Sequence, residues 1–237
     1  MPVTSSAVTH QGLVRTKNED AFVELTKQRV WVVADGMGGL SEGQFASQKV
    51  ISIMQQRLSN QDPKHITTQT IMSALQEANT ELFAYSEHSL AGAKLGATVA
   101  ILLLTESHYY FIWAGDSRGY LLRDAQLTQQ TRDHSRANQL LDGGTITSAQ
   151  ATSHPSGHEV VRAIGVKSDV QLELCQGQLH RGDAFLLCSD GLNDALSDFE
   201  IEKELNSGHS NSAQALVQAV LLRGARDNVS CIVIHND

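Results

Sequence analysis

The sequence lacks a basic run of five or more residues, a long apolar run and a secretion signal in residues 1–10. Its formal net charge is −8, and nucleic acid is a poor candidate partner because clustered Lys and Arg bind phosphate backbones. The longest apolar run, residues 97–104, is far shorter than the ~20 residues of a membrane helix. We therefore expect a cytoplasmic protein with neither a membrane nor a nucleic-acid partner.

Cysteine is scarce, and the Cys-x-x-Cys spacing of metal and redox sites is absent. Cys175, Cys188 and Cys231 each lie inside an apolar, strand-like run. We interpret them as buried free thiols rather than metal ligands or nucleophiles. With 237 residues, of which 41% are hydrophobic and 19% charged, the chain is expected to form one globular domain, residues 1–237.

Apolar patterning indicates both strands and helices. Eight segments are typical of strands: residues 21–25, 30–34, 97–104, 109–114, 119–122, 170–174, 184–188 and 229–234. Short gaps between consecutive strands predict antiparallel neighbours. Three segments carry apolar residues at helical spacing: residues 41–58, 66–86 and 212–222.

Two capping boxes add detail to the helices, Ser41 with Gln44 and Ser197 with Glu200, and the second starts a shorter helix. The segregated strands and helices predict an α+β fold with two stacked antiparallel sheets and helix pairs outside. Residues 131–165 are polar, contain Gly and Pro, and connect two strand regions. A long irregular connection of this kind is typical of a functional lid.

Acidic residues fall at the ends of the most apolar predicted strands. They are Glu19, Asp20, Asp35, Asp116, Asp190 and Asp227. Any one of them can be a turn residue, since Asp-Gly is common in turns. Together they indicate more, because a carboxylate at the end of a buried strand loses hydration unless something compensates. A divalent cation shared by several carboxylates is one such compensation.

The ligand types at these positions favour a hard metal ion. No histidine lies within two residues of Asp35, Asp116, Asp190 or Asp227. Oxygen ligands suit Mg²⁺ or Mn²⁺ rather than Zn²⁺, and several carboxylates could hold two ions about 3.5–4 Å apart with a nucleophilic water between them. Gly36 lets the backbone approach closely and offers its carbonyl as a ligand.

Arg15 lies five residues before Asp20. A guanidinium can hold two oxygens of a phosphate dianion. Taken alone, Arg15 would be interpreted as an ordinary surface arginine, and the neighbouring acids favour the functional interpretation.

Eight short motifs in order carry a resemblance to a known family. They are R-T-K-N-E-D (15–20), V-V-A-D-G-M-G-G (32–39), G-A-T (96–98), A-G-D-S-R (114–118), D-H-S (133–135), H-P with V-V-R-A-I-G (within 154–165), S-D-G (189–191) and R-D-N-V-S (226–230). The chain resembles the protein phosphatase type 2C, or PPM, family of metal-dependent serine/threonine phosphatases in its small bacterial form. The motifs span nearly the whole chain.

The resemblance implies a four-layer α-β-β-α sandwich and a site for two Mn²⁺ or Mg²⁺ ions. Asp35 would bridge both ions, the Gly36 carbonyl would bind one, and Asp190 and Asp227 would complete the ligands of the other. Glu19 and Asp20 would act mainly through metal-bound waters, and Asp116 resembles the residue that binds a third, weaker ion. These are the expected metal-site residues.

The resemblance also implies a reaction. Arg15 would hold the substrate phosphate, and residues 131–165 would contain a flap beside the active site. Metal-activated water would hydrolyse phosphoserine and phosphothreonine directly, without a phospho-enzyme, so Arg15, Asp35, Asp190 and Asp227 are the expected catalytic residues. Phosphoproteins, and a Ser/Thr kinase with its targets, are the expected partners of a monomeric signalling enzyme.

Met37 departs from the pattern of animal members, in which a histidine at this position serves as general acid. Methionine cannot donate a proton, so a metal-bound water is the expected donor, with His134 and His154 as weaker candidates. D-G-M-G-G is common in bacterial members, so activity is compatible with Met37.

Two other functions are open to the sequence. The first is a catalytically weak or inactive module of the same fold that binds phosphoproteins, although such a module would be expected to have lost the acids at the metal positions. The second is nucleotide binding through the glycine-rich residues 35–43, although these contain neither a Gly-Lys-Ser/Thr nor a G-x-G-x-x-G pattern.

Overall fold

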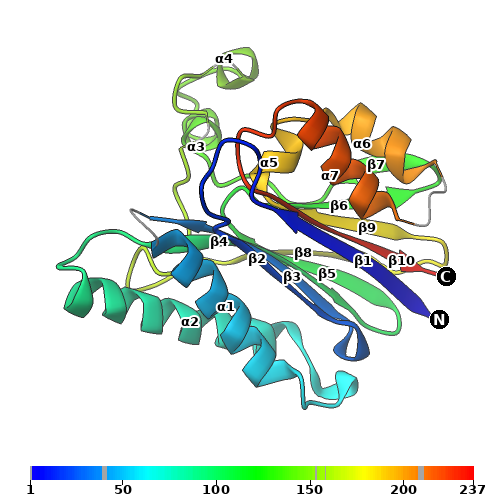
Figure 1. Cartoon of the computed structure of the whole chain (residues 1–237). Coiled ribbons are helices and arrows are strands. Elements are labelled where there is room, and N and C mark those ends of the chain that lie inside the picture. Colours follow the sequence, from blue (N-terminus) through cyan, green and yellow to red (C-terminus); the bar gives the residue numbers. More distant parts are fainter. Residues whose placement is uncertain (1, 39–41, 153, 158, 208–210) are drawn as a thin grey trace.

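A computed structural model describes residues 2–38, 42–152, 154–157, 159–207 and 211–237 (Figure 1). The predicted N-cap Ser41 lies outside these residues, so the structure does not describe its capping box. The second predicted box is confirmed, because the Glu200 carboxylate accepts from the backbone N–H of Ser197 at 3.0 Å and from its hydroxyl at 2.8 Å.

Ten strands form two five-stranded antiparallel sheets. The first sheet has the order β1 (Val3–His10), β10 (Val229–Asn236), β9 (Ala184–Cys188), β6 (Arg118–Arg123) and β7 (Gln126–Gln129). The second has the order β2 (Asp20–Leu25), β3 (Val30–Met37), β4 (Gly96–Leu104), β5 (His108–Ala114) and β8 (Glu173–Gln178).

Helices cover the outer face of each sheet (Figure 1). α1 (Glu42–Leu58) and α2 (Thr68–Ser89) pack on the second sheet. α5 (Asp190–Asn193), α6 (Asp198–Leu205) and α7 (Ser212–Leu222) pack on the first. The four-layer α-β-β-α sandwich is confirmed. No helix in the described part of the chain is long and apolar enough to cross a membrane.

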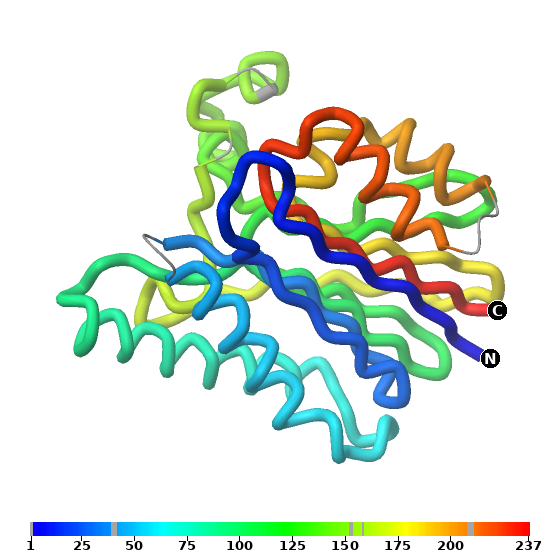
Figure 2. The backbone as a smooth tube through the Cα atoms, in the orientation of Figure 1, coloured from blue at the N-terminus to red at the C-terminus, as the bar shows by residue number. Residues whose placement is uncertain are grey.

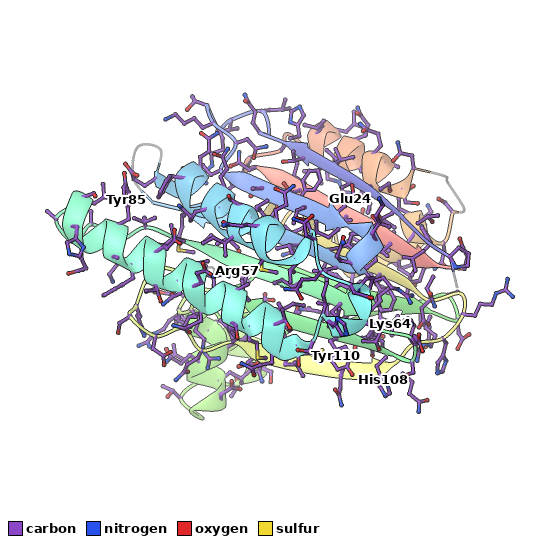
Figure 3. All side chains as sticks on the ribbon, turned by 90° about the horizontal axis from the view of Figure 1, so that it is seen from below. Glu24, Arg57, Lys64, Tyr85, His108 and Tyr110 are labelled. Carbon is purple, nitrogen blue, oxygen red and sulfur yellow. The ribbon has the colours of Figure 1, made fainter. Side chains whose placement is uncertain are left out.

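Short helices lie outside these layers. α3 (Arg136–Asp142) and α4 (Ser148–Thr152) project from one end of the sandwich (Figure 1). Of two 3-10 turns, η1 (Thr26–Gln28) joins β2 to β3 and η2 (Pro63–His65) lies between α1 and α2. In Figure 3 the helical layer of α1 and α2 is seen from below, with Tyr85 toward one end and Lys64 toward the other.

The inner faces of the two sheets meet in an aromatic and aliphatic core. Trp31, Phe111 and Phe185 are completely buried there, and the Phe111 and Phe185 ring centroids are 6.0 Å apart. Each large side chain buried in this way contributes about 1.5–3 kcal/mol to folding. The core holds the two sheets in a fixed relation, which positions the residues at their ends.

Several predicted boundaries are wrong for physical reasons. β1 was not predicted because its sequence, VTSSAVTH, is polar and half-buried, as suits a strand at a sheet edge. β7 was not predicted either, because it is only four residues long. Residues 170–172 precede β8 instead of forming a strand, and Val170 and Leu172 pack against the helical side of the core.

The short gap between β5 and β6 predicted that these strands would be antiparallel neighbours. That prediction is wrong, because they belong to different sheets. The chain leaves the second sheet after Ala114 and enters the first at Arg118. Gly115 has φ +113, and a Cβ there would lie 2.4 Å from the Cβ of Thr98. Glycine therefore permits the switch between sheets, and Asp116 lies at this switch.

All three cysteines are free. Cys188 and Cys231 are fully buried, as predicted, whereas Cys175 is only half-buried. Cys175 packs against the core between the sheets, but its strand, β8, lies at a sheet edge and leaves it only partly covered.

Candidate active site

Two of the predicted acids face each other across the β2–β3 pair. The antiparallel register places Asp20 opposite Asp35, and the backbone N–H of Gly36 donates to the Glu19 carbonyl at 3.1 Å. The buried apolar residues of β3 fix this register, since a slip by one residue would turn their side chains to the other face. Glu19, Asp20, Asp35 and Gly36 are thereby brought to one end of the second sheet.

Gly36 packs against the first turn of α1 without room for a side chain. A Cβ on Gly36 would lie 1.9 Å from the Gly43 carbonyl oxygen. A Cβ on Gly43 would lie 2.6 Å from Glu19 Oε1 and 2.8 Å from the Gly36 carbonyl oxygen. The Glu19 carboxylate and the Gly36 carbonyl therefore converge on one small space that only glycine at both positions leaves open.

Asp190 and Asp227 are joined by a second glycine contact. Asp190 opens α5, directly after β9, and a Cβ on Gly191 would lie 1.9 Å from the Asn228 carbonyl oxygen and 3.6 Å from the Asp227 Cβ. The start of α5 therefore sits tightly against the residues that precede β10.

A buried amide then fastens the loop between β1 and β2 to this segment. Asn228 Nδ2 donates to the carbonyls of Gln11 at 2.9 Å and Lys17 at 2.8 Å. Its Oδ1 accepts from the Glu19 N–H at 2.8 Å. Residues 11–18 consequently lie beside residues 223–228 (Figure 2). Asn228 lies in the R-D-N-V-S motif, but its clamping role was not predicted.

Ser189 links the two sheets at the acid cluster, and it too was not predicted. Its hydroxyl donates to Asp20 Oδ2 at 2.7 Å and accepts from the Ser230 N–H at 2.9 Å. Asp20 Oδ1 is buried and has no hydrogen-bond partner among the residues that the structure describes. A buried carboxylate oxygen without a donor is costly, and a cation beside Asp20 would offset that cost.

Burial and crowding also raise the pKa values of carboxyl groups in the cluster, and a nearby cation would offset this effect. Burial is the largest cause that raises the pKa of Asp35 well above its ordinary value, and four aspartates add to it. These are Asp20, Asp190, Asp116 and Asp227. Burial likewise raises the pKa of Asp20 to about 7, against the lowering effect of its serine hydrogen bonds.

The donor set fits divalent cations. It consists of carboxylates and one backbone carbonyl, the oxygen ligands of Mg²⁺ and Mn²⁺. Over the residues that can be described, no three Asp, Glu, His or Cys side chains already form a closed set around one point. Oxygen ligands, crowded acids and a buried Asp20 oxygen without a hydrogen-bond partner in the described residues together fit a divalent cation.

Arg15 lies in the cluster through a bidentate ion pair. Its Nε and Nη2 donate to the Asp227 Oδ1 and Oδ2 at 2.8 and 2.6 Å. The side chains are 54% and 40% exposed, so water screens the pair and it contributes little stability. Asp227 is the main cause that raises the pKa of Arg15. The guanidinium is already oriented to hold two oxygens.

Asp116 lies at the edge of the cluster, in a cleft of about 560 Å³ that it shares with Asp190, Asn193 and Asp194. Burial first, and then Asp190 and Asp133, raise the pKa of Asp116 to about 7. Ser148 and Ala151 line the cleft from the α4 side. The predicted irregular stretch 131–165 therefore contains two helices and borders the acids.

The base of this segment is firmly anchored. Arg118 Nε and Nη2 donate to the two Asp133 oxygens at 2.9 and 2.7 Å. Backbone bridges join Ser135 to Val160 and Ala97 to Ile164. The projecting helices thus rise from a fixed base.

The His134 ring makes several contacts within this anchored base. Its Nδ1 accepts from the Gly115 N–H at 3.0 Å, and its Nε2 lies 3.1 Å from Glu173 Oε1. The ring stacks on Trp113 with 6.0 Å between centroids, and burial is the largest cause that lowers its pKa. His154 Nδ1 accepts from the Ser156 N–H at 3.1 Å.

Comparison with known proteins agrees with this geometry. The family model described as Protein phosphatase 2C matches residues 10–228. The serine/threonine protein phosphatase PstP of Mycobacterium tuberculosis is 35% identical over 229 residues, which are 96% of this chain and 44% of PstP. The serine/threonine phosphatase stp of Listeria monocytogenes is 31% identical over 238 residues, covering 97% of this chain and 94% of that protein. The chain thus spans less than half of PstP but nearly all of stp.

Solved structures share the fold. The crystal structure of PstP/Ppp from M. tuberculosis superimposes with a TM-score of 0.91 at 34% identity, covering 99% of both chains. The catalytic domain of PstP in complex with two manganese ions gives a TM-score of 0.86 at 33% identity, covering 98% of this chain and 97% of that one. These matches confirm the resemblance inferred from the eight motifs.

Proposed function

Because the chain belongs to the protein phosphatase 2C family, we propose that it hydrolyses phosphoserine and phosphothreonine on proteins. One observation carries the proposal: acids from β2, β3, α5 and the segment just before β10 meet at one end of the sandwich, and one buried Asp20 oxygen among them has no hydrogen-bond partner in the described part of the chain. We propose that residues 1–237 act as one catalytic domain, with the flap within 131–165.

Asp35, the Gly36 carbonyl, Asp190 and Asp227 would hold two Mn²⁺ or Mg²⁺ ions. When bound, such ions neutralise the oxygens of a transferring phosphoryl group and lower the pKa of a water between them. Glu19 and Asp20 would hold ordered waters around the ions, and Asp116 would hold a third, weaker ion. Asp20 and Asp116 are among the acids that, after burial, raise the pKa of Asp35.

Arg15 would hold and orient the substrate phosphate. Its guanidinium donates to both carboxylate oxygens of Asp227, and a phosphate dianion can accept two hydrogen bonds in the same bidentate geometry. Engagement of Asp227 by cations would free the guanidinium for substrate. Met37 has no proton to give, so we assign no side chain of this chain as general acid.

The test is hydrolysis of p-nitrophenyl phosphate and a phosphothreonine peptide with Mn²⁺ or Mg²⁺, and its loss in EDTA. Asp190→Ala should lower kcat/KM by orders of magnitude and weaken Mn²⁺ binding measured by calorimetry. Asp198→Ala, at the exposed start of α6, is the matched control and should leave both unchanged. Metal-loaded wild-type protein that turns over neither substrate would refute the proposal.

The inactive phosphoprotein-binding module is the disfavoured alternative, because acids are present at every proposed ligand position. Calorimetry without Mn²⁺ binding would revive it. We further propose that the physiological substrates are phosphoproteins of a Ser/Thr kinase pathway, and that the enzyme is a cytoplasmic monomer. Mass spectrometry of phosphoproteins in cells with and without the gene, and the solution mass of the purified protein, test these points.

A further inference from the structure

A small apolar cleft of about 240 Å³ begins at Met37, the residue that follows Asp35 and Gly36 on β3. Its apolar lining comes from the end of β3, the start of β4 and the segment that returns from the projecting helices. These residues are Met37, Leu95, Val160, Val161, Ala163 and Val166. Methionine at the position where some relatives carry a catalytic acid thus lies against other apolar groups.

The walls of the cleft are held by backbone contacts. Ala97 and Ile164 exchange N–H···O bonds of 3.0 and 2.8 Å, and the Val161 N–H donates to the His134 carbonyl at 2.9 Å. A Cβ on Gly96 would lie 2.6 Å from the Ile164 carbonyl oxygen and 2.7 Å from Val166 Cγ2. The glycine therefore allows the returning segment to lie close enough to form the cleft.

The cleft lies within a short distance of the proposed reaction centre. Met37 follows Asp35 by two residues on β3, a rise of about 6.6 Å along a strand. Two residues of an extended substrate peptide span the same length. A side chain one or two positions from the phosphorylated residue can therefore reach the cleft.

We propose that this cleft is a specificity subsite for an apolar side chain flanking the phosphorylated residue, an inference that rests on the proposed phosphatase function. Its volume is below the 300–1,000 Å³ of pockets for whole small molecules and suits one side chain. Met37 contributes packing surface there, since methionine adapts its shape to varied apolar partners.

Positive charge at the cleft disfavours basic substrate side chains. Lys94 and Arg162 also line it. Arg162 Nη1 is paired with Glu173 at 2.7 Å, whereas Lys94 is exposed and forms no ion pair among the described residues. A basic side chain entering the cleft would meet Lys94, so the subsite disfavours lysine and arginine.

The experiment compares phosphothreonine peptides that differ only in one residue, leucine, alanine or lysine, at each of the two positions before and after the phosphothreonine. At one position kcat/KM should be about tenfold higher for leucine than for alanine, as burial of a few methylenes implies, and lowest for lysine. Val166→Phe, which fills the cleft, should bring the leucine-to-alanine ratio close to one. Lys94→Glu should raise kcat/KM for the lysine peptide about fivefold.

Lys64→Glu is the matched control, since it changes the net charge equally and Lys64 lies before the start of α2, whereas Lys94 follows the end of that helix. Figure 3 shows Lys64 at the opposite end of the helical layer from Tyr85, which lies near the end of α2. It should leave the peptide ranking unchanged, and all variants should retain turnover of p-nitrophenyl phosphate, which has no flanking side chain. If Val166→Phe unfolds, the exposed Lys94→Glu substitution decides the question.

Equal kcat/KM for leucine and alanine at all four positions would overturn the subsite, as would a ranking that Lys94→Glu leaves unchanged. Failure of the proposed function is distinguishable, because wild-type protein would then not turn over p-nitrophenyl phosphate either. Fluorescence anisotropy of the labelled peptides would still report whether leucine is preferred and whether Lys94→Glu alters binding of the lysine peptide.

Discussion

Replacing Asn228 with alanine should loosen the loop that carries Arg15 and Glu19. The substitution removes three hydrogen bonds, to the Gln11 and Lys17 carbonyls and from the Glu19 N–H. Each such bond contributes about 0.5–1.5 kcal/mol net, and more when a partner is left buried without another. We therefore expect the free energy of unfolding to fall by about 2–4 kcal/mol, or roughly 6–12 °C in Tm for a chain of this size.

Urea unfolding in EDTA measures this loss without a contribution from metal binding, and calorimetry measures Mn²⁺ affinity, which should weaken because Glu19 loses its anchor. Asn206→Ala is the matched control: this exposed amide donates one bond, to Ala125 at 3.0 Å, and should cost less than about 1 kcal/mol. If Asn228→Ala costs no more than Asn206→Ala and leaves Mn²⁺ affinity intact, the clamp has been misassigned.

Three further predictions concern packing, protonation and metal. Gly36→Ala should lower the free energy of unfolding by about 3 kcal/mol or more, because its Cβ would lie 1.9 Å from the Gly43 carbonyl; Gly143→Ala, with no contact nearer than 3.4 Å, should be almost neutral in the same urea titration. Burial holds the pKa of His134 below its ordinary value, so below about pH 6.5 the unfolded chain binds a proton that the folded chain does not. The free energy of unfolding of the wild type, measured by urea titration, should therefore fall relative to that of His134→Asn between pH 7.5 and 5.5. Parallel curves of this free energy against pH would contradict the prediction. Mn²⁺ at a hundred times its Kd should add about 2.7 kcal/mol, seen as a higher Tm that EDTA reverses; an unchanged Tm would exclude a site formed only in the folded protein.

The convergence of the acids could be predicted from the sequence, because all of them fall at the ends of the most apolar predicted strands. Asp20 and Asp35 follow from the register of two apolar strands, and Gly36 from its place after an aspartate. Their supporting residues could not be predicted in the same way. Asn228 and Ser189 are small polar residues with no periodicity, and only the contact between distant segments shows what they hold.

The fold, too, could be predicted from the sequence only in part. Buried strands and long amphipathic helices have strong periodic signals, and the four layers follow from them. The edge strand β1 has a polar sequence, and α3 and α4 are short, so neither produced a signal that could be separated from a loop. The switch at Gly115 was also not predicted, because a three-residue gap between strands is equally compatible with a hairpin.

The pairing of Arg15 with Asp227 across 212 positions has a consequence for biosynthesis. β1 and β2 leave the ribosome early, but residues 11–18 gain their anchor only when Asn228 has been made and β10 has inserted between β1 and β9. Contacts this distant in sequence form late and slowly. A nascent chain therefore carries half of the acid cluster on the second sheet long before the other half exists. The complete acid cluster can therefore assemble only after Asp190 and Asp227 have both been made.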